Sequence, residues 1–190
     1  MPPSIALTAA RLARLGDAVL PLMARLILAA VLLVYYWRSG VTKLGEGIFG
    51  LFQPSSGAYV QIFPRTMEAV GYDVSQLSFL HWITVVAGTA AELALPAMIV
   101  LGLLTRFSAI GMIGFIVVQP VVDVVGHGAE PATIGAWFDA TSASLILDQR
   151  SFWMLSLAVL VFKGAGPFSV DRILFRNVLL ARPAYPQPAP

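Results

Sequence analysis

Four long apolar stretches constrain this chain more than any other feature of its sequence. They lie at about 18–37, 80–104, 107–125 and 144–162. A helix needs about 20 residues to cross the hydrocarbon core of a bilayer, and each stretch is close to that length. Because lipid cannot hydrogen-bond an open backbone, each stretch is expected to cross as an α-helix. The sequence therefore predicts an all-α fold, a bundle of four transmembrane helices.

The composition agrees with burial in lipid and excludes several classes of function. Of the 190 residues, 58% are hydrophobic and only 12% are charged, with a mean hydropathy of +0.81. Soluble domains carry about 25% charged residues. The net charge is +2, but the basic residues are scattered along the chain, so no nucleic-acid partner is expected. The chain has no cysteine, which excludes disulfides, covalently attached haem and thiolate-bound iron–sulfur clusters.

The distribution of basic residues predicts the orientation of the bundle. Lys and Arg are enriched in cytoplasmic loops, and here they mark the N-terminus (Arg11, Arg14), the turn at Arg106 and the C-terminal tail. Both termini are therefore expected in the cytoplasm, with a long outward loop between the first and second helices. The expected domains are a cytoplasmic or interfacial N-terminus at 1–17, a membrane domain at 18–175 and a Pro-rich cytoplasmic tail at 176–190.

Glu92 is the most informative polar residue within the apolar stretches. It lies 12 residues after Leu80 and 14 before Arg106, so at a rise of 1.5 Å per residue it is about 20 Å from either end. An ionisable side chain is costly at that depth and indicates a functional site. By the same rise, Gln119 of the third stretch lies at a similar depth.

Other polar residues gather in the outer half of the predicted bundle. If they face one another, they form a chamber that holds a quinone head group, relays protons or binds a small polar substrate. A buried hydrogen-bond network that only fixes helix packing is the alternative. No metal site is expected, because His81 and His127 are the only histidines and both lie at outer helix ends. The candidate site consists of Glu92, Gln119, Asp123, Arg38, Lys43, Asp148 and Arg150.

Arg25 is the only charged residue in the first stretch, about 10 Å from its inner end by helix rise. A long arginine side chain can extend along apolar surface to the cytoplasmic headgroups. An ion pair with an acid on a neighbouring helix is the alternative. We expect the first arrangement.

Three motifs in order resemble the DoxX family of small four-helix membrane proteins. WRSGVTKL at 37–44 is similar to the end of that family's first helix. GTAAELALPAMIVLGLLTR at 88–106 is similar to its second helix, and KGAGPFSVDRIL at 163–174 to the segment after its fourth. The residues that match family positions are Arg25, Lys43, Glu92, Arg106, Ser169 and Asp171.

This resemblance implies an accessory subunit of a quinone-linked redox system in the bacterial inner membrane. The chain itself carries no cofactor motif, so a quinone is the cofactor to consider, and the chain is not expected to be a complete enzyme alone. The expected partners are membrane lipids and either a second protein or further copies of the chain. A non-enzymatic accessory or small-solute transport component, tied to secreted metal-responsive peptides, is the alternative, and a purely structural anchor is a third hypothesis.

The C-terminal motif also has a local interpretation. Gly164 and Gly166 can end a helix in conformations that other residues resist. Pro167 prevents the helix from continuing, and Ser169 can cap a short helix that begins at Val170. We therefore expect a structural role for this motif, which also contains Asp171.

Overall fold

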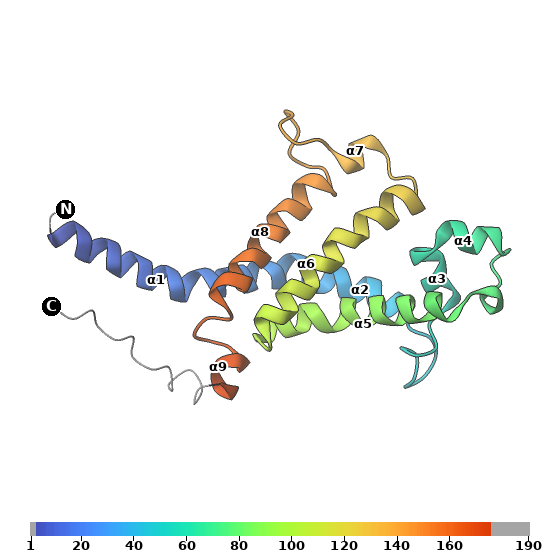
Figure 1. Cartoon of the computed structure of the whole chain (residues 1–190), viewed down its shortest axis with the longest axis horizontal. Coiled ribbons are helices and arrows are strands. Elements are labelled where there is room, and N and C mark those ends of the chain that lie inside the picture. The colour runs from blue at the N-terminus through green and yellow to red at the C-terminus, as the bar shows by residue number, and fades with distance from the viewer. Residues whose placement is uncertain (1–2, 176–190) are drawn as a thin grey trace, which may run out of the picture.

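The computed structural model describes residues 3–175, and within that range the chain is helical and has no β-strand (Figure 1). The predicted all-α class is confirmed. Three described helices are long and apolar enough to cross a membrane: Ser4–Lys43, Phe79–Leu101 and Thr105–Gly126. In chain order the elements are α1 (Pro3–Leu28), η1 (Ala29–Leu33), α2 (Val34–Lys43), α3 (Ser56–Ile62), α4 (Pro64–Ala69), η2 (Val74–Gln76), α5 (Phe79–Leu101), α6 (Thr105–Val121), η3 (Val122–Gly126), α7 (Pro131–Ile134), α8 (Leu147–Lys163) and α9 (Val170–Leu174).

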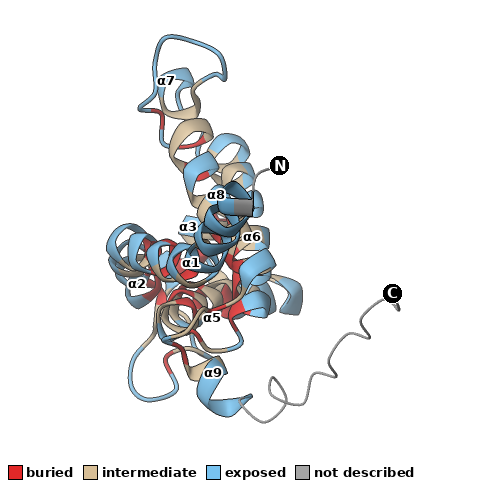
Figure 2. Ribbon diagram, turned by 90° about the vertical axis from the view of Figure 1, so that its left-hand side faces the viewer, coloured by how far each residue is buried: buried red, intermediate tan, exposed pale blue. Residues whose placement is uncertain are grey.

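The first helix is much longer than the stretch at 18–37 predicts. α1, the π-helical turn η1 and α2 form one continuous helix that begins at Pro3 and ends at Lys43. Its early start follows from residues 3–17, which are rich in the strong helix formers alanine, leucine and arginine. This N-terminal part projects away from the other helices and is largely exposed (Figures 1 and 2).

The fourth apolar stretch forms α8, a helix of 17 residues. At 1.5 Å per residue it is about 26 Å long, a little short of the hydrocarbon core. The helix begins later than predicted because Ser144 and Asp148 bond each other reciprocally before its first turn. α8 packs along α6 and α1. A fourth membrane crossing, and with it the four-helix bundle, stays a prediction.

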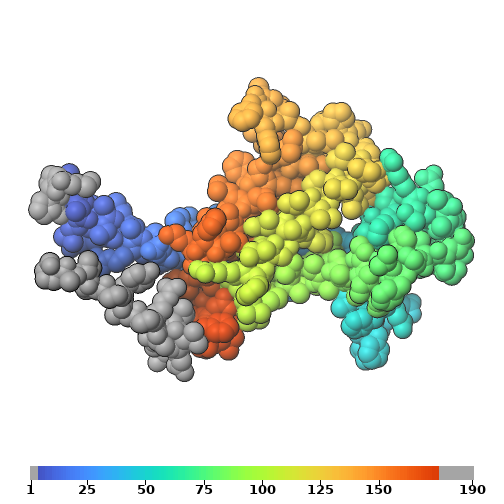
Figure 3. Space-filling view, viewed as in Figure 1, coloured from blue at the N-terminus to red at the C-terminus, as the bar shows by residue number. Residues whose placement is uncertain are grey.

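The predicted outward loop contains α3, α4 and η2. Ala58, Tyr59 and Met67 from this segment pack on Val85 near the start of α5. The preceding loop, residues 44–55, protrudes from the side of the molecule (Figure 3) and exposes Ile48 almost completely.

The main core lies where α1, α2, α5, α6 and α8 meet, and the buried residues concentrate there in the end-on view (Figure 2). Gly40 of α2 allows a close approach of α5, since a Cβ atom at this position would lie 2.8 Å from Leu93 Cδ2. The core side chains are Ala24, Leu28, Leu32, Tyr36, Ile99, Ala109, Met112, Ile116, Leu157 and Leu160.

Candidate functional site

A buried ion pair joins the end of α2 to the middle of α5. Lys43 Nζ lies 2.9 Å from Glu92 Oε2 and 3.1 Å from Oε1. The side chains of Lys43 and Glu92 are only 4% and 9% exposed. Lys43 also donates to the Ser39 hydroxyl oxygen, at 2.6 Å. Each charge is held in a poorly solvated place by the other, because an unpaired buried charge is several kcal/mol less stable.

A cavity of about 670 Å³ lies beside this ion pair, between α2, α5 and α6. Small residues form much of its wall, which leaves space between the helices that larger side chains would fill. The apolar part of the lining is the larger, and the polar side chains beside the ion pair are those of Tyr35, Ser39, Gln61, Thr84, Gln119, Asp123 and His127. The small residues are Ala87, Gly88 and Ala91 on α5, and Gly111 and Gly114 on α6.

Two tyrosines hold Gln119 in place, and sequence reasoning missed both. The Tyr36 hydroxyl donates to Gln119 Oε1 at 2.9 Å, and Gln119 Nε2 donates to the Tyr35 hydroxyl at 3.2 Å. Tyr36 is fully buried, whereas Tyr35 lines the cavity. Adjacent tyrosines in an otherwise aliphatic span were the available signal, because a buried hydroxyl requires a hydrogen-bond partner.

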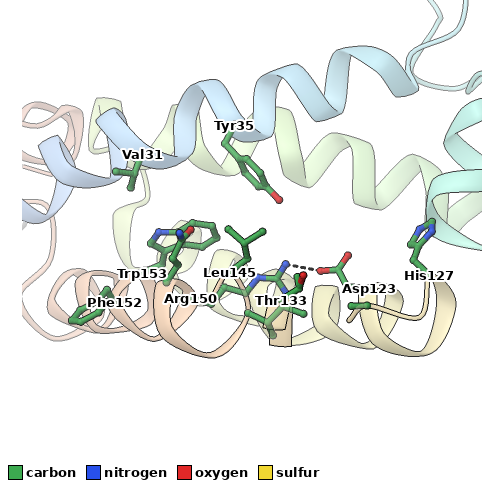
Figure 4. A pocket seen from close by; sticks show the side chains of 12 residues that line it. Val31, Tyr35, Asp123, His127, Thr133, Leu145, Arg150, Phe152 and Trp153 are labelled. Carbon is green, nitrogen blue, oxygen red and sulfur yellow. Dashed lines mark hydrogen bonds and ion pairs between the residues drawn. The ribbon is translucent and has the colours of Figure 1, made fainter. Parts of the chain in front are cut away.

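A second ion pair lies between η3 and α8. Arg150 Nη2 donates to Asp123 Oδ2 at 2.5 Å. Both residues line a separate cavity of about 780 Å³. Figure 4 shows Val31 and Tyr35 on one side of this cavity and Trp153, Arg150 and Asp123 on the other. Tyr35, Asp123 and His127 line both cavities, so the two spaces are neighbours.

The polar residues predicted to share one chamber are thus divided between two cavities. Lys43, Glu92 and Gln119 belong to the first, and Arg150 to the second. The structure does not bring Arg38 or Asp148 to either lining. Arg38 is exposed on α2, and Asp148 is engaged locally because it accepts a hydrogen bond from the Ser144 amide at the start of α8.

Arg25 takes neither of the two positions expected from the sequence. Its buried guanidinium donates to four backbone carbonyl oxygens and makes no ion pair with any residue of the described range 3–175. The end of α5 leaves carbonyls without helical partners, and a planar guanidinium has enough donors to serve several at once. Arg25 therefore ties α1 to the end of α5 and to the segment after α8. The acceptors are the carbonyls of Ile99, Val100, Ala165 and Phe168.

The C-terminal motif closes the same end of the bundle. Asp171 accepts hydrogen bonds from the amides of Leu104 and Thr105, at 2.6 and 2.9 Å, where α6 begins. Ser169 caps α9, which begins at Val170 as predicted. Gly164 and Gly166 both have positive φ angles, which glycine adopts without strain.

In the range 3–175, no group of three or more His, Asp or Glu side chains is close enough to hold a metal ion. His127 instead has Nε2 2.8 Å from the Gln61 carbonyl oxygen, and His81 caps the start of α5 together with Ser78.

Comparison with known proteins agrees with the resemblance seen in the motifs. A family model described as DoxX matches residues 20–124, more than half of the chain. The matched range contains both Lys43 and Glu92 and ends before α8, so the motif at 163–174 lies outside it. No curated protein and no solved structure matches the sequence. With its membrane-length apolar helices, the chain is an integral membrane protein that belongs to the DoxX family.

Proposed function

We propose that this protein is an accessory subunit of a quinone-linked membrane redox system and that the cavity beside Lys43 and Glu92 receives the quinone head group. The observation that carries the proposal is a buried ion pair in the wall of a 670 Å³ cavity between apolar helices. Cavities of roughly 300–1,000 Å³ are typical for small ligands and cofactors.

The lining fits a flat ring with polar oxygens and an apolar tail. Glycines and alanines on α5 and α6 leave a slot, while Ile83, Phe115 and Val118 supply apolar contact. The Thr84 hydroxyl and the side-chain amide of Gln119 supply polar atoms from opposite helices. A bound quinone would supply two-electron chemistry coupled to proton uptake, which none of the side chains here can perform.

Lys43 holds exchangeable protons at the cavity wall, and Glu92 accepts hydrogen bonds from them. Lys43 Nζ bonds both carboxylate oxygens of Glu92, so the pair is neutral as a unit while the proton stays on Nζ. A ligand oxygen that approaches Nζ competes with Glu92 for these donors. The pair can therefore orient a polar head group and donate a proton from Nζ. Because this donation would leave the Glu92 carboxylate without its counter-charge, the pair must then take up another proton.

The same proposal places the chain in the bacterial inner membrane, with both termini in the cytoplasm and four crossings. Two features support it. Arg11 and Arg14 precede the apolar part of the first helix, and Arg25 joins α1 to the segment after α8 at one end of the bundle. Reporter fusions after residue 1 and after residue 190 should both report the cytoplasm, and a periplasmic signal from either end would reject the topology.

A small-solute transport component is the alternative function. The observation that favours it is that α3 covers one end of the first cavity, where the Gln61 carbonyl oxygen lies 2.8 Å from Nε2 of His127, the residue that follows η3. Such a contact can open without unfolding a helix. Under this hypothesis, a purified protein reconstituted in vesicles moves solute and retains no quinone.

Gly114→Leu tests the quinone proposal directly. A Cβ atom at Gly114 would meet no other atom within 4 Å, so the new side chain enters the cavity without displacing the core. Leucine is also the better helix former, by up to about 1 kcal/mol, so the variant should fold. Binding of a short-chain benzoquinone to purified protein should weaken at least about tenfold, which corresponds to about 1.4 kcal/mol.

Gly16→Leu is the matched control. This glycine lies on the projecting part of α1, and a Cβ there would meet only a side-chain atom of Leu20, at 3.8 Å. Quinone binding should be the same in this control as in the wild type. If Gly114→Leu also binds quinone with wild-type affinity, the first cavity does not receive it and the proposal fails.

A further inference from the structure

The second cavity contains a buried guanidinium with unused hydrogen-bond donors. Arg150 is only 7% exposed, and it uses Nη2 to bond Asp123. Its Nε and Nη1 atoms are buried and have no hydrogen-bond partner among the residues that the structure describes. Buried donors are nearly always satisfied, and those of a charged group are especially costly to leave free. An acceptor from outside the chain would satisfy them.

Charge decides which kind of acceptor fits. Asp123 already neutralises Arg150, and the only other titratable side chains that line this cavity are those of Tyr35 and His127. An anionic ligand would add a second negative charge, beside that of Asp123, to a site whose one permanent positive charge is that of Arg150. A neutral oxygen acceptor completes the hydrogen bonding of Arg150 and leaves the charge balance unchanged.

The other residues that line the second cavity favour a ligand with an apolar body. Leu145, Ile146, Phe152 and Trp153 line the cavity beside Val31 of the first helix. Val31 and Leu145 are about half exposed and Phe152 is 66% exposed, so the opening of the cavity is apolar as well. Because Val31 lies in the membrane-length helix Ser4–Lys43, this opening is accessible from lipid.

We propose that the second cavity is a binding site for a neutral carbonyl-bearing lipid, with its carbonyl oxygen at the free donors of Arg150 and its apolar body along Phe152, Trp153 and Val31. An ester-linked glycerolipid and a quinone share this chemistry. The site is separate from the one beside Lys43 and Glu92 and does not rest on the function proposed for it.

Trp153 lies in the cavity wall and can report binding through quenching of its fluorescence. The other three tryptophans are replaced by phenylalanine in the full-length protein, and retained helicity is checked first. The protein in detergent is then titrated with three probes of equal chain length: a brominated fatty-acid methyl ester, the free brominated fatty acid and a brominated hydrocarbon. A short-chain benzoquinone forms a fourth arm. The substitutions are Trp37→Phe, Trp82→Phe and Trp137→Phe.

The ester should quench Trp153 at concentrations at least about tenfold lower than the hydrocarbon, because hydrogen bonds from a charged donor are worth more than a factor of ten. If the quinone quenches Trp153 at lower concentrations than the ester does, the ligand of this site is a quinone. If the ester quenches at lower concentrations, the ligand is an ester-linked lipid. Equal quenching by ester and hydrocarbon would show that only water meets Arg150 and overturns the proposal. Stronger binding of the free fatty acid than of the ester would contradict the proposal that the ligand is neutral.

A pair of double variants assigns the effect to Arg150. Arg150→Met with Asp123→Asn removes both charges together, so no buried charge is left alone, and it should abolish the preference for the ester. Lys163→Met with Asp17→Asn removes the exposed ion pair at the other end of the bundle and should keep that preference. If the first variant fails to fold, the comparison of ester with hydrocarbon in the single-tryptophan protein still decides. Gly114→Leu should leave ester binding unchanged, which separates this site from the first cavity.

Discussion

Replacing Glu92 by glutamine should destabilise the protein far more than the loss of an exposed ion pair. The substitution keeps the size of the side chain but leaves the Lys43 ammonium, 4% exposed, without its counter-charge. Removal of one partner from a buried pair costs about 3–5 kcal/mol. For a chain of this length, each kcal/mol lowers the midpoint of thermal unfolding by about 2–4 °C, so the expected decrease is about 6–20 °C.

The assay is thermal unfolding of purified protein in detergent, followed by circular dichroism. Asp17→Asn is the control, because the Lys163–Asp17 pair is 46% and 60% exposed and should contribute less than about 1 kcal/mol. The double variant Lys43→Met with Glu92→Met removes both charges and should recover most of the stability, since well-packed apolar side chains can replace a buried pair at little cost.

The outcome also shows whether the Lys43–Glu92 pair acts on a ligand or only stabilises the packing of the helices. If Glu92→Gln lowers the midpoint no more than Asp17→Asn does, Glu92 is solvated or unpaired and the proposed site is refuted. If the double variant is as stable as the wild type and has lost quinone binding, the pair acts on the ligand. A stable double variant that still binds quinone would show that the pair serves packing alone.

Three further predictions concern the ends of helices. Gly102→Ala should be strongly destabilising in the same thermal assay, because φ is +68° and a Cβ atom would lie 2.6 Å from Ser169 Cβ; a wild-type midpoint would contradict this geometry. Asp171→Ala removes the acceptor for two amides at the start of α6 and should cost about 0.5–2 kcal/mol in chemical unfolding, whereas no change would mean that other groups satisfy those amides. Hydrogen bonds from the Ser75 hydroxyl, the Gln76 amide and the Ser75 backbone hold the pKa of Asp73 below its ordinary value. The turn is therefore fully stabilised above the ordinary carboxyl pKa and loses this support as the pH falls through the lowered one. NMR titration of the carboxyl should show the lowered midpoint, and Asp73→Asn should remove the pH dependence of the protection factor of the Ser75 amide, which is its exchange rate relative to an unstructured peptide at the same pH.

The helices were predictable because their cause is local. Uninterrupted apolar runs of membrane length predict helices at 80–104 and 107–125, and the structure has them within a few residues, at Phe79–Leu101 and Thr105–Gly126. The N-terminal boundary was less predictable. Membrane length limits how much of a helix is apolar, but it does not stop a helix from extending beyond its apolar part, as α1 does when it begins at Pro3.

The partners of the polar residues were not predictable, because depth in a bilayer fixes only one of three coordinates. The sequence predicts a similar depth for Glu92 and Gln119, yet Glu92 pairs with Lys43 while Gln119 bonds two tyrosines of the first helix. The sequence predicts that the Arg25 side chain reaches the headgroups, but its guanidinium donates to four backbone carbonyl groups instead. Rotation about each helix axis decides these contacts, and a nearly uniform apolar surface contains little information about that rotation.

The sequence by itself determined the all-α class, the lipid environment, the DoxX family and the presence of ionisable residues that require partners. These properties depend on composition, on the length of apolar runs and on short motifs, all of which can be read along one chain. Only the tertiary structure decided that the polar residues form two ion pairs at two neighbouring cavities, with Asp148 and Arg38 outside both linings. The physical reason is that an ion pair requires contact within about 4 Å, and such contact depends on how the helices pack and rotate against one another.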